Sequence, residues 1–496
     1  MIYDYAVIGA GAAGMTSALV LAKHGRSVAL IESSGQIGPL LRGFKRKGVF
    51  FDTGFHYTGG LGDGEILDIF FRYLGLSNHL QKEPFDPNGF DLFRFPNIDF
   101  EFLFPYGYDR IEQRLCDAFP EETSAVSNYL QNIMESCRGR PYLNLNADMG
   151  SLQGMKAVHG TTLQEHLDNL STNSLLNRIL STHCFLHGAT PTETSFINHA
   201  AIVGPYYQSV NGVQGGGRSI VDAFHTELTG LGVDLFCGHP VIRISPASDG
   251  SLKQLHADND QTIFCRSCIC TIHPITMLQL IPPSVFRPGY VNRINGLEET
   301  LSAYILYGIS RNPISSLANR NIFLYPKSDI PGFHQDMPIA ERPVFMSGMK
   351  TNGDGRNGYG FIAICPANFR ETVRWKDSHT GRRPAEYDEF KTQVAADLKT
   401  HAENICPELK GQITFMELST PLTLRDFSQT PFGSMYGVKH RVGQYNPMPV
   451  TRLKGLYLAG QAVVAPGLLG AVISGLLACG NILGHDFLRK EMMQCR

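Results

Sequence analysis

The stretch Ile2–Glu32, IYDYAVIGAGAAGMTSALVLAKHGRSVALIE, decides the fold. An apolar strand runs into Gly9-Ala10-Gly11-Ala12-Ala13-Gly14, and Ala12–His24 then carries apolar residues at helical spacing. Ser27–Ile31 is predicted to form a second strand, which Glu32 closes. This order of strand, glycine turn, helix, strand and acid predicts a βαβ unit that binds a dinucleotide.

Each glycine of the turn has a mechanical role. The first allows the tight turn, the second lets the backbone approach a pyrophosphate, and the third lets helix and strand pack closely. The pyrophosphate then sits on the helix N-terminus, where free N–H groups and the helix dipole favour an anion. An acid at the end of the second strand favours a ribose 2′-hydroxyl over a 2′-phosphate. We therefore predict that Gly9, Gly11, Ala13, Gly14 and Glu32 bind one dinucleotide, either FAD or NAD.

Composition excludes several classes of protein. The chain has 496 residues, 43% hydrophobic and 18% charged, which predicts two or more ordinary globular domains. A net charge of −2 gives no indication of nucleic-acid binding. No secretory signal is recognised at the start, and eleven cysteines without an export signal are expected to be reduced thiols. We therefore expect a cytoplasmic protein.

Two local patterns resemble a metal site and a membrane span. Cys265, Cys268 and Cys270 lie in a predicted strand without a second Cys/His pair at zinc spacing, so no metal is predicted there. The apolar run Leu456–Leu483 is long enough to span a bilayer, but Gln461, Pro466 and several glycines interrupt it. A strand, a glycine turn and a buried helix explain this run better.

The C-terminal segment Gly455–Gly484 has the same predicted order of elements as the N-terminal one: a strand leads through a glycine-rich turn into a last helix. We therefore expect the chain to leave the cofactor, build a second domain and return. The predicted FAD-binding domain is discontinuous and consists of residues 1–75, 213–285 and 440–496. The predicted substrate domain is inserted into it and consists of residues 76–212 and 286–439.

Between the two ends, other patterns predict further elements. Phe85–Pro105 has the alternation of antiparallel strands, and Val233–Ile244 is predicted as one strand. Tyr108–Asn132 and Thr162–Leu180 are each predicted as one helix, and a helix over Leu175–His187 would place His183 and His187 on one face. With no carboxylate nearby in the sequence, that pair is not predicted to bind a metal.

Further motifs carry a resemblance to a known family. The run Gly48–Gly59, GVFFDTGFHYTG, is similar to the segment that follows the FAD motif in the phytoene desaturase, carotenoid isomerase and retinol saturase family. Other matches follow in the same order along nearly the whole chain: Phe95-Pro96, Phe104-Pro105 with Gly107, Phe119-Pro120-Glu121, Gly215-Gly216-Gly217 and Gly455–Gly460. His56-Tyr57 after Phe51–Gly54 places the resemblance on the isomerase and retinol saturase side.

The resemblance implies an α/β protein with a glutathione-reductase-like, Rossmann-type FAD-binding domain, noncovalent FAD and an inserted α+β substrate domain. It implies a long apolar channel for a polyene or isoprenoid lipid. It also assigns cofactor contacts beyond the first turn: Leu41 and Arg42 over the pyrophosphate, Val241 at adenine, Gly460 and Gln461 at the ribityl chain, and Gly467, Leu468 and Leu469 at the isoalloxazine.

Two positions depart from the family pattern. Gly38-Pro39 stands where the family usually has Gly-Gly, and proline removes an N–H and restricts φ, so a different loop over the diphosphate is expected. Gln461 stands where an acid is common, yet its side chain still accepts a hydrogen bond.

His56 and Tyr57 are the predicted catalytic residues. They follow the matched segment, and either one is expected to position a substrate or to donate a proton after hydride transfer. Abundant Phe and Tyr in 85–108 and 196–210 are compatible with a lipid channel and equally with an ordinary core.

Together these patterns predict an FAD-dependent oxidoreductase or isomerase that desaturates, saturates or isomerises a C=C bond of an apolar polyene or isoprenoid lipid. Its electrons would be exchanged with a quinone, oxygen or a redox partner, and the protein would contact membranes peripherally. Two alternatives stay open: a flavoprotein that oxidises amines or other small molecules, and a flavin-less lipid carrier similar to the Rab GDP-dissociation inhibitors.

Overall fold

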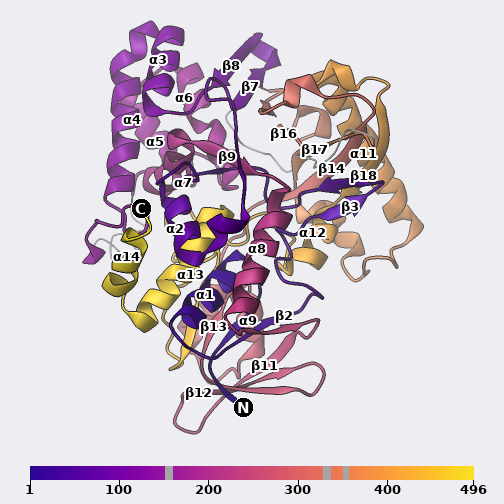
Figure 1. The fold of residues 1–496 in the computed structure, drawn as a ribbon. Helices are drawn as coiled ribbons and strands as arrows, with labels where there is room; N and C mark the ends of the chain where they lie inside the picture. The colour runs from indigo at the N-terminus through magenta and orange to yellow at the C-terminus, as the bar shows by residue number, and fades with distance from the viewer. Residues whose placement is uncertain (151–159, 328–336, 350–356) are drawn as a thin grey trace.

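The computed structural model describes residues 1–150, 160–327, 337–349 and 357–496. Two seven-stranded sheets organise the chain, one at each end of the molecule in Figure 1. The first lies beside the N-terminus, and the second lies in the opposite half, beside a group of helices.

The first sheet carries the βαβ unit. Parallel strands run in the order β10-β2-β1-β13-β19, and the antiparallel strands β12 and β11 continue from the first half of β13. The bounds are β1 Ile2–Ile8, β2 Val28–Glu32, β10 Asp234–Cys237, β11 Val241–Pro246, β12 Leu252–Ala257, β13 Thr262–Cys270 and β19 Leu456–Leu458. Chain order reverses between β1 and β13, and ligands of open α/β sheets bind at the carboxyl ends of the strands at such a switch point.

Helices from both ends of the chain cover this sheet. Helix α1 (Ala12–Lys23) packs against α13 (Gly467–Leu483), where a Cβ on Gly475 would lie 2.7 Å from the carbonyl oxygen of Ala13. Helix α8 (Gly216–Gly230) also contacts α1. The remaining helices near this half are α2 Ile66–Leu74, α9 Pro274–Leu280, α10 Pro288–Asn295 and α14 His485–Met493.

The second sheet is mainly antiparallel and is buried on both faces. Its order is β18-β14-β17-β16-β15-β7-β8, in which only the β15–β7 pair is parallel. The bounds are β7 Asp91–Phe95, β8 Phe100–Phe104, β14 Ser302–Ser310, β15 Asn321–Leu324, β16 Val344–Gly348, β17 Tyr359–Ala367 and β18 Ile413–Ser419. Alternate residues face helix α11 (Ala385–Ile405) on one side and an aromatic core on the other.

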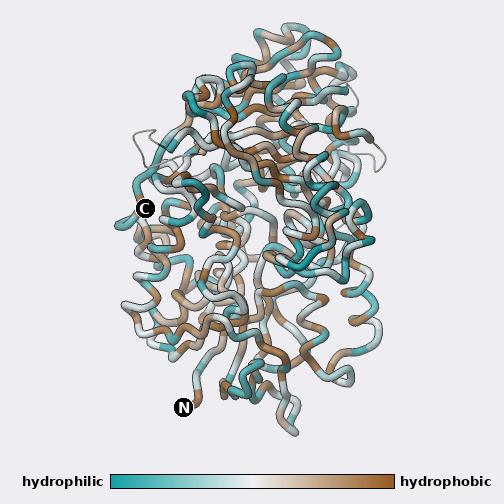
Figure 2. The backbone as a smooth tube through the Cα atoms, turned by 90° about the vertical axis from the view of Figure 1, so that its right-hand side faces the viewer, coloured by the Kyte–Doolittle hydropathy of each residue, from teal (hydrophilic) through white to brown (hydrophobic). Residues whose placement is uncertain are grey.

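We define the aromatic core by Phe90, Phe93, Phe104, Tyr207, Phe323 and Phe345, all of which are buried. Helices cover it on the side away from the sheet, and hydrophobic segments run through the interior of this half in Figure 2. Those helices are α3 Tyr108–Ala118, α4 Thr123–Arg138, α5 Leu163–Leu170, α6 Ser174–Ser181 and α7 Phe196–Gln208. Short strands join the two halves: β3 Phe44–Arg46, β4 Val49–Phe51, β5 Thr58–Gly59, β6 Lys82–Pro84 and β9 Val210–Val213.

Several predicted elements are divided, and each prediction of a single element was wrong. Tyr108–Asn132 forms α3 and α4, because Pro120 lacks the N–H that a continuous helix needs. Thr162–Leu180 forms α5 and α6, since the Asn173 side chain accepts hydrogen bonds from two N–H groups and starts a new helix. Val233–Ile244 is interrupted at Gly238, whose φ of 82° is left-handed.

The condition under which His183 and His187 would share a helix face, a continuous helix over Leu175–His187, is not met. Helix α6 ends at Ser181, and η5, a 3-10 helix over Thr182–Leu186, follows it. The predicted N-terminal βαβ unit, the fold class and the strands within 85–105 are confirmed. The domain boundaries stay a prediction.

Among the described residues, none of the helices combines the length and the hydrophobicity that a membrane crossing requires. The run Leu456–Leu483 consists of β19, a glycine turn and α13, as predicted.

Candidate functional site

The turn between β1 and α1 leaves one side open. A Cβ on Gly14 would lie 1.8 Å from the carbonyl oxygen of Gly9, and Gly9 itself has a φ of 92°. A Cβ on Gly11 would meet nothing within 4 Å. Gly9 and Gly14 are therefore required by the turn and by packing, whereas Gly11 borders open space. No side chain caps the N-terminus of α1, so its first N–H groups are free for an anion.

Glu32 lies at the end of β2 and is tied to the same turn. One carboxylate oxygen accepts a hydrogen bond from the Ala10 N–H at 2.8 Å, and the other accepts one from the Ser34 N–H at 2.8 Å. The side chain is buried; Oε1 also accepts a hydrogen bond from the Ser33 hydroxyl at 3.3 Å, whereas Oε2, which the Ala10 N–H contacts, can accept a further one. Glu32 is thus oriented to receive the hydroxyl groups of a ribose.

The loop after Glu32 folds back over the turn. The Gly38 N–H donates to the Ala10 carbonyl at 2.8 Å, and the Gly38 carbonyl accepts from the N–H groups of Leu41 and Arg42. Arg42 donates to the Ser34 hydroxyl and the Gln36 carbonyl. Pro39 lies inside this short turn, and the expected effect of Gly38-Pro39 on the loop over the diphosphate stays a prediction.

The C-terminal segment reaches the same region. The Gly460 N–H donates to the Ser474 hydroxyl at 2.7 Å, and the Gln461 carbonyl accepts from His440 Nε2 at 2.7 Å. Gly467 has a φ of 82°, and open space surrounds the position of its absent Cβ. The N-terminus of α13, like that of α1, has no side-chain cap.

A pocket connects this segment with β5 and with the helices of the other half. Thr58 and Gly59 form one side, Gly467, Leu468 and Leu469 form a second, and Leu186 with Tyr206 closes a third. The structure therefore brings the end of the Gly48–Gly59 motif next to the C-terminal glycine turn. Val241 lies elsewhere, on edge strand β11, where it packs with Ile8 and Ile31 beneath the sheet.

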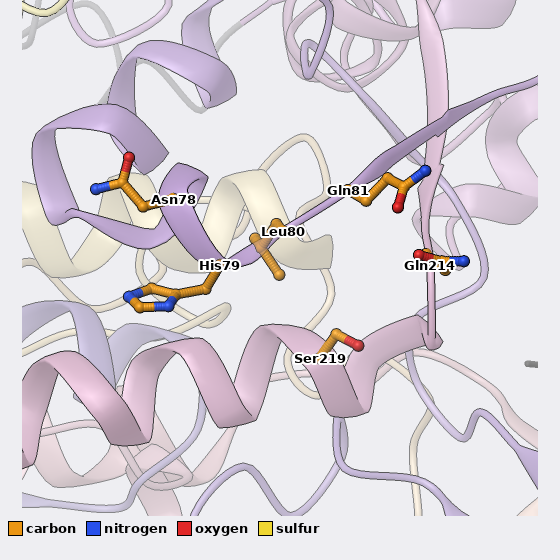
Figure 3. A pocket seen from close by; sticks show the side chains of 6 residues that line it. All are labelled: Asn78, His79, Leu80, Gln81, Gln214 and Ser219. Atoms are coloured by element: carbon orange, nitrogen blue, oxygen red, sulfur yellow. The ribbon is translucent and has the colours of Figure 1, made fainter.

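A second pocket lies between η1 (Leu76–His79) and α8 (Figure 3). Its lining is Asn78, His79, Leu80, Gln81, Gln214 and Ser219, none of which was predicted as a site residue. It is wide open to solvent, and His79 is already paired with Glu227 at 2.7 Å. We assign no role to it.

Tyr57 and His56 lie inside the molecule, close to the pocket. The Tyr57 ring makes an edge contact with Tyr206, with ring centroids 5.4 Å apart, and stacks on Phe345. His56 also contacts Phe345, and its buried Nδ1 has no hydrogen-bond partner. Burial lowers the pKa of His56 to about 4, so its imidazole is neutral at physiological pH.

The Tyr57 hydroxyl belongs to a buried polar network that the sequence did not indicate. It donates to Asp91 Oδ2 at 3.3 Å, and His183 Nε2 lies 3.0 Å from the same oxygen. The Asn321 amide donates to the other carboxylate oxygen at 2.9 Å. Asp91 and His183 are fully buried in the aromatic core. A buried carboxylate needs partners, and this network supplies them to both oxygens of Asp91, whereas His183 Nδ1 and Asn321 Oδ1 are buried without a partner among the described residues.

His183 and His187 therefore do not share a face. His183 turns toward Asp91, whereas His187 Nε2 lies 3.2 Å from His199 Nδ1 on α7. Because the α-helix changes to a 3-10 helix after Ser181, the side chains of His183 and His187 point in different directions.

Asp52 is a second carboxylate whose importance the sequence did not indicate. Its Oδ1 accepts a hydrogen bond from the Gly217 N–H at 2.8 Å, at the N-terminus of α8. Burial raises the pKa of Asp52 to about 7. It lies within the motif Gly48–Gly59 and holds α8 against the segment that leads to His56.

Two uncapped helix N-termini, an open glycine turn and an oriented acid fit a bound dinucleotide, and together they define a dinucleotide-dependent oxidoreductase. The flavin containing amine oxidoreductase family matches residues 12–332, more than half of the chain. The chain belongs to this family. FAD is accordingly its cofactor, and the protein is an FAD-dependent oxidoreductase.

Individual relatives share only a low sequence identity with this chain. All-trans-retinol 13,14-reductase of Macaca fascicularis is 24% identical over 97% of this chain and 86% of that protein. An inactive all-trans-retinol 13,14-reductase of Danio rerio is 23% identical over 97% and 85%. An oxidoreductase structure from Methanosarcina mazei superposes with a TM-score of 0.66 at 15% identity, covering 95% of this chain and 98% of that one. That structure supports the fold.

Proposed function

We propose that the protein reduces one C=C bond of a conjugated apolar isoprenoid of the retinoid class. The observation that carries the substrate class is the similarity to all-trans-retinol 13,14-reductase along 97% of the chain. A relative named as inactive is similar over the same span, so overall similarity does not by itself indicate activity. The proposal therefore also needs support from the residues near the predicted cofactor site.

The surroundings of Tyr57 suit a flat polyene. Tyr206 lines the pocket and contacts Tyr57, and Phe345 extends the aromatic surface to Phe323, with ring centroids 4.9 Å apart, and to Phe185. Aromatic faces contact conjugated chains without demanding hydrogen bonds. Within the part of the chain that the structure describes, no carboxylate other than Asp91 is part of the network around Tyr57, and Asp91 is already paired. The pocket itself is lined mainly by apolar residues, and its charged lining residue, Arg140, is a cation, so an apolar substrate fits the pocket better than a charged amine does.

Saturation of a C=C bond adds a hydride to one carbon and a proton to the other. FAD, when bound, supplies the two-electron hydride exchange. We assign the proton to the Tyr57 hydroxyl. Burial, followed by the charge of Asp91, raises the pKa of Tyr57 well above its ordinary value, so the hydroxyl is protonated at neutral pH. Asp91 orients the hydroxyl, and His183 Nε2 contacts the same carboxylate oxygen of Asp91.

A single-turnover experiment tests the proposed reaction. FAD-loaded protein is reduced with dithionite under nitrogen, mixed with all-trans-retinol, and its products are analysed by mass spectrometry. We expect a product two hydrogens heavier than retinol, formed together with reoxidised flavin. A colourless protein that FAD does not reconstitute, or oxidation of primary amines without any retinol turnover, would overturn the proposal.

The same experiment distinguishes the related reactions. Desaturation would require oxidised flavin and would give a product two hydrogens lighter, whereas isomerisation would change the retention time and leave the mass unchanged. Either outcome would keep the C=C bond as the site of reaction and would reject saturation. Since the substrate class is insoluble in water, we also propose peripheral contact with a membrane surface.

A further inference from the structure

We propose that Cys184, His187 and His199 bind one zinc ion. The three side chains are buried, and their ligand atoms lie within 4.8 Å of one another. This cluster is separate from the Asp91 network, and the proposed reaction does not use it.

Local structure explains why the three ligands meet. Cys184 lies in η5 and His187 ends it, so the two are three residues apart on a 3-10 helix. Side chains at i and i+3 eclipse one another in this helix, which places both ligands on one face. His199 lies in the first turn of α7, which begins at Phe196 after the Ser195 side chain caps it. Two elements thus present three ligands to one point.

The spacing of the ligand atoms suits a tetrahedral ion. His187 Nε2 and His199 Nδ1 are 3.2 Å apart, and Cys184 Sγ lies 3.9 Å from His199 Nδ1. With Zn–N near 2.0–2.1 Å and Zn–S near 2.3 Å, tetrahedral geometry places such atoms roughly 3.3 Å and 3.6 Å apart. These two pairs are therefore within a few tenths of an ångström of the spacing in a zinc site, and the Cys184 and His187 ligand atoms, which lie within 4.8 Å of each other, would draw together around the ion.

The surroundings also resemble the outer shell of a metal site. His199 Nε2 lies 3.2 Å from the Tyr129 hydroxyl, which is 3.2 Å from the Tyr207 hydroxyl. A ligating histidine usually binds a polar partner through its other ring nitrogen, which orients the ring and selects its tautomer. Tyr129 holds His199 in the orientation that turns Nδ1 toward Cys184 and His187.

Three protein ligands leave one position open. Among the described residues, no fourth His, Cys, Asp or Glu joins the cluster, so water would complete the tetrahedron. The ligands flank residues that line the pocket: Leu186 lies between Cys184 and His187, and Ala201 and Ile202 follow His199. Zinc would therefore fasten η5 to α7 and hold one wall of the pocket in place.

Metal analysis of the FAD-loaded protein, prepared without a metal-affinity tag, tests the site. After incubation with zinc chloride and removal of the excess, we expect about one zinc per chain. Replacement of zinc by cobalt should give visible bands at wavelengths beyond the flavin absorption, with the intensity of tetrahedral coordination. Neither measurement on the wild type depends on whether a variant folds.

Variants then assign the ligands. Cys184→Ser and His199→Ala should lose the zinc and the cobalt bands, whereas the matched controls Cys137→Ser and His166→Ala should retain both. Cys137 and His166 lie beside α7 but bind Ala200 and Asn132 respectively. Tyr129→Phe should weaken zinc binding by about 10–100-fold. Wild-type protein that takes up no zinc, or ligand variants that retain it, would overturn the proposal and leave a metal-free His187–His199 hydrogen bond.

Discussion

At the scale of the residue, Gly11 and Gly14 look equivalent in the motif but differ in the structure. A methyl group at Gly14 would collide with the Gly9 carbonyl, whereas one at Gly11 would enter open space beside the free N–H groups of α1. We predict that Gly14→Ala lowers the stability of the apoprotein by about 1–3 kcal/mol or more. Gly11→Ala should fold normally and bind FAD at least about tenfold more weakly.

Thermal unfolding of the apoproteins and FAD titration of each variant separate the two effects. Gly35→Ala is a suitable control, because its Cβ also meets open space and its backbone is not left-handed. Should Gly11→Ala bind FAD like the wild type, the pyrophosphate does not approach this glycine and the predicted cofactor site is wrong.

The buried hydroxyl of Tyr57 carries the second prediction. Tyr57→Phe removes the proposed proton donor while keeping the ring contacts with Tyr206 and Phe345. We expect kcat for retinol saturation to fall by about 10²–10⁴-fold, with the FAD spectrum unchanged and little change in KM. Tyr325→Phe is the control, since its hydroxyl is also buried but donates to the Thr182 carbonyl.

Steady-state kinetics and deuterium incorporation from D₂O provide the readouts. Equal losses in the Tyr57 and Tyr325 variants would mean that the Tyr57 hydroxyl acts through packing alone, and the assignment of the proton would then be abandoned.

The glycine motif and the Tyr57 network show which contacts of single residues can be predicted from the sequence and which cannot. The close approach of Gly14 to the Gly9 carbonyl lies within the motif, so the spacing was sufficient to predict this turn, and the contacts of the glycines with the cofactor stay a prediction. Tyr57 meets Asp91 and His183 only because a sheet and a 3-10 helix converge. Nothing in the pattern near any one of these residues indicates the other two.

At the scale of the element, the N-terminus of α8 depends on a distant carboxylate. Gly215 precedes the helix in a left-handed conformation and offers no side chain, and Asp52 accepts the Gly217 N–H instead. Burial raises the pKa of Asp52 to about 7, whereas an unfolded Asp titrates near ~3.9. Between these pH values the folded protein holds a proton that the unfolded chain has released.

The free energy of unfolding should therefore fall as the pH rises through this window, by up to about 1.4 kcal/mol per pH unit. The contribution of protonated Asp52 to the free energy of unfolding is complete below the pKa of the unfolded Asp and is lost as the pH passes about 7. Asp52→Asn keeps an acceptor for Gly217 and cannot titrate, so we expect its stability to depend less on pH.

Urea unfolding at pH 5 and pH 7.5 measures the effect. Asp222→Asn, on the exposed face of α8 beside Arg218, is the matched control. If wild type and Asp52→Asn lose the same stability between the two pH values, the buried carboxyl is not the titrating group.

Element boundaries show a second limit of sequence reasoning. Periodicity predicted helices across Pro120 and across Asn173 because apolar residues continue at helical spacing on both sides of each break. The break itself depends on one missing N–H or one competing side-chain acceptor. By contrast, the unit Ile2–Glu32 was predicted within one or two residues of its observed boundaries, since its strands and helix are buried and flanked by glycine.

At the scale of the whole molecule, the cofactor region is assembled from segments that are distant in sequence. Helix α13 packs on α1, and the pocket joins Thr58 and Gly59 to Gly467–Gly470 and to Tyr206. The similarity of the two terminal motifs allowed the return of the chain to be predicted. The second sheet of the molecule, with strands from residues 91–104 and 302–419, has no comparable motif in its sequence. Its strand order could therefore be learned only from the structure.

An apolar substrate must also reach this interior, and we predict that the surface around α12 (Pro421–Ser428) contacts a membrane. Phe427 is 58% exposed and Phe432 is 51% exposed, at the end of α12 and just after it. Val373, which is 42% exposed, lies in η8 (Phe369–Trp375), and η8 packs against α12. We call these three residues the exposed apolar patch, and Arg374 and Lys376 are exposed beside it.

Aromatic residues next to basic ones are typical of proteins that bind the interface of acidic bilayers. We predict that the FAD-loaded protein floats with phosphatidylcholine vesicles that contain phosphatidylserine, and less with phosphatidylcholine alone. The double variant Phe427→Ser, Phe432→Ser should remain largely in the soluble fraction. Phe487→Ser is the control, because Phe487 is 48% exposed on α14, outside the patch. If the double variant floats as well as this control, another surface contacts the membrane; if the wild type stays soluble even with retinol-loaded vesicles, the substrate reaches the protein without a membrane.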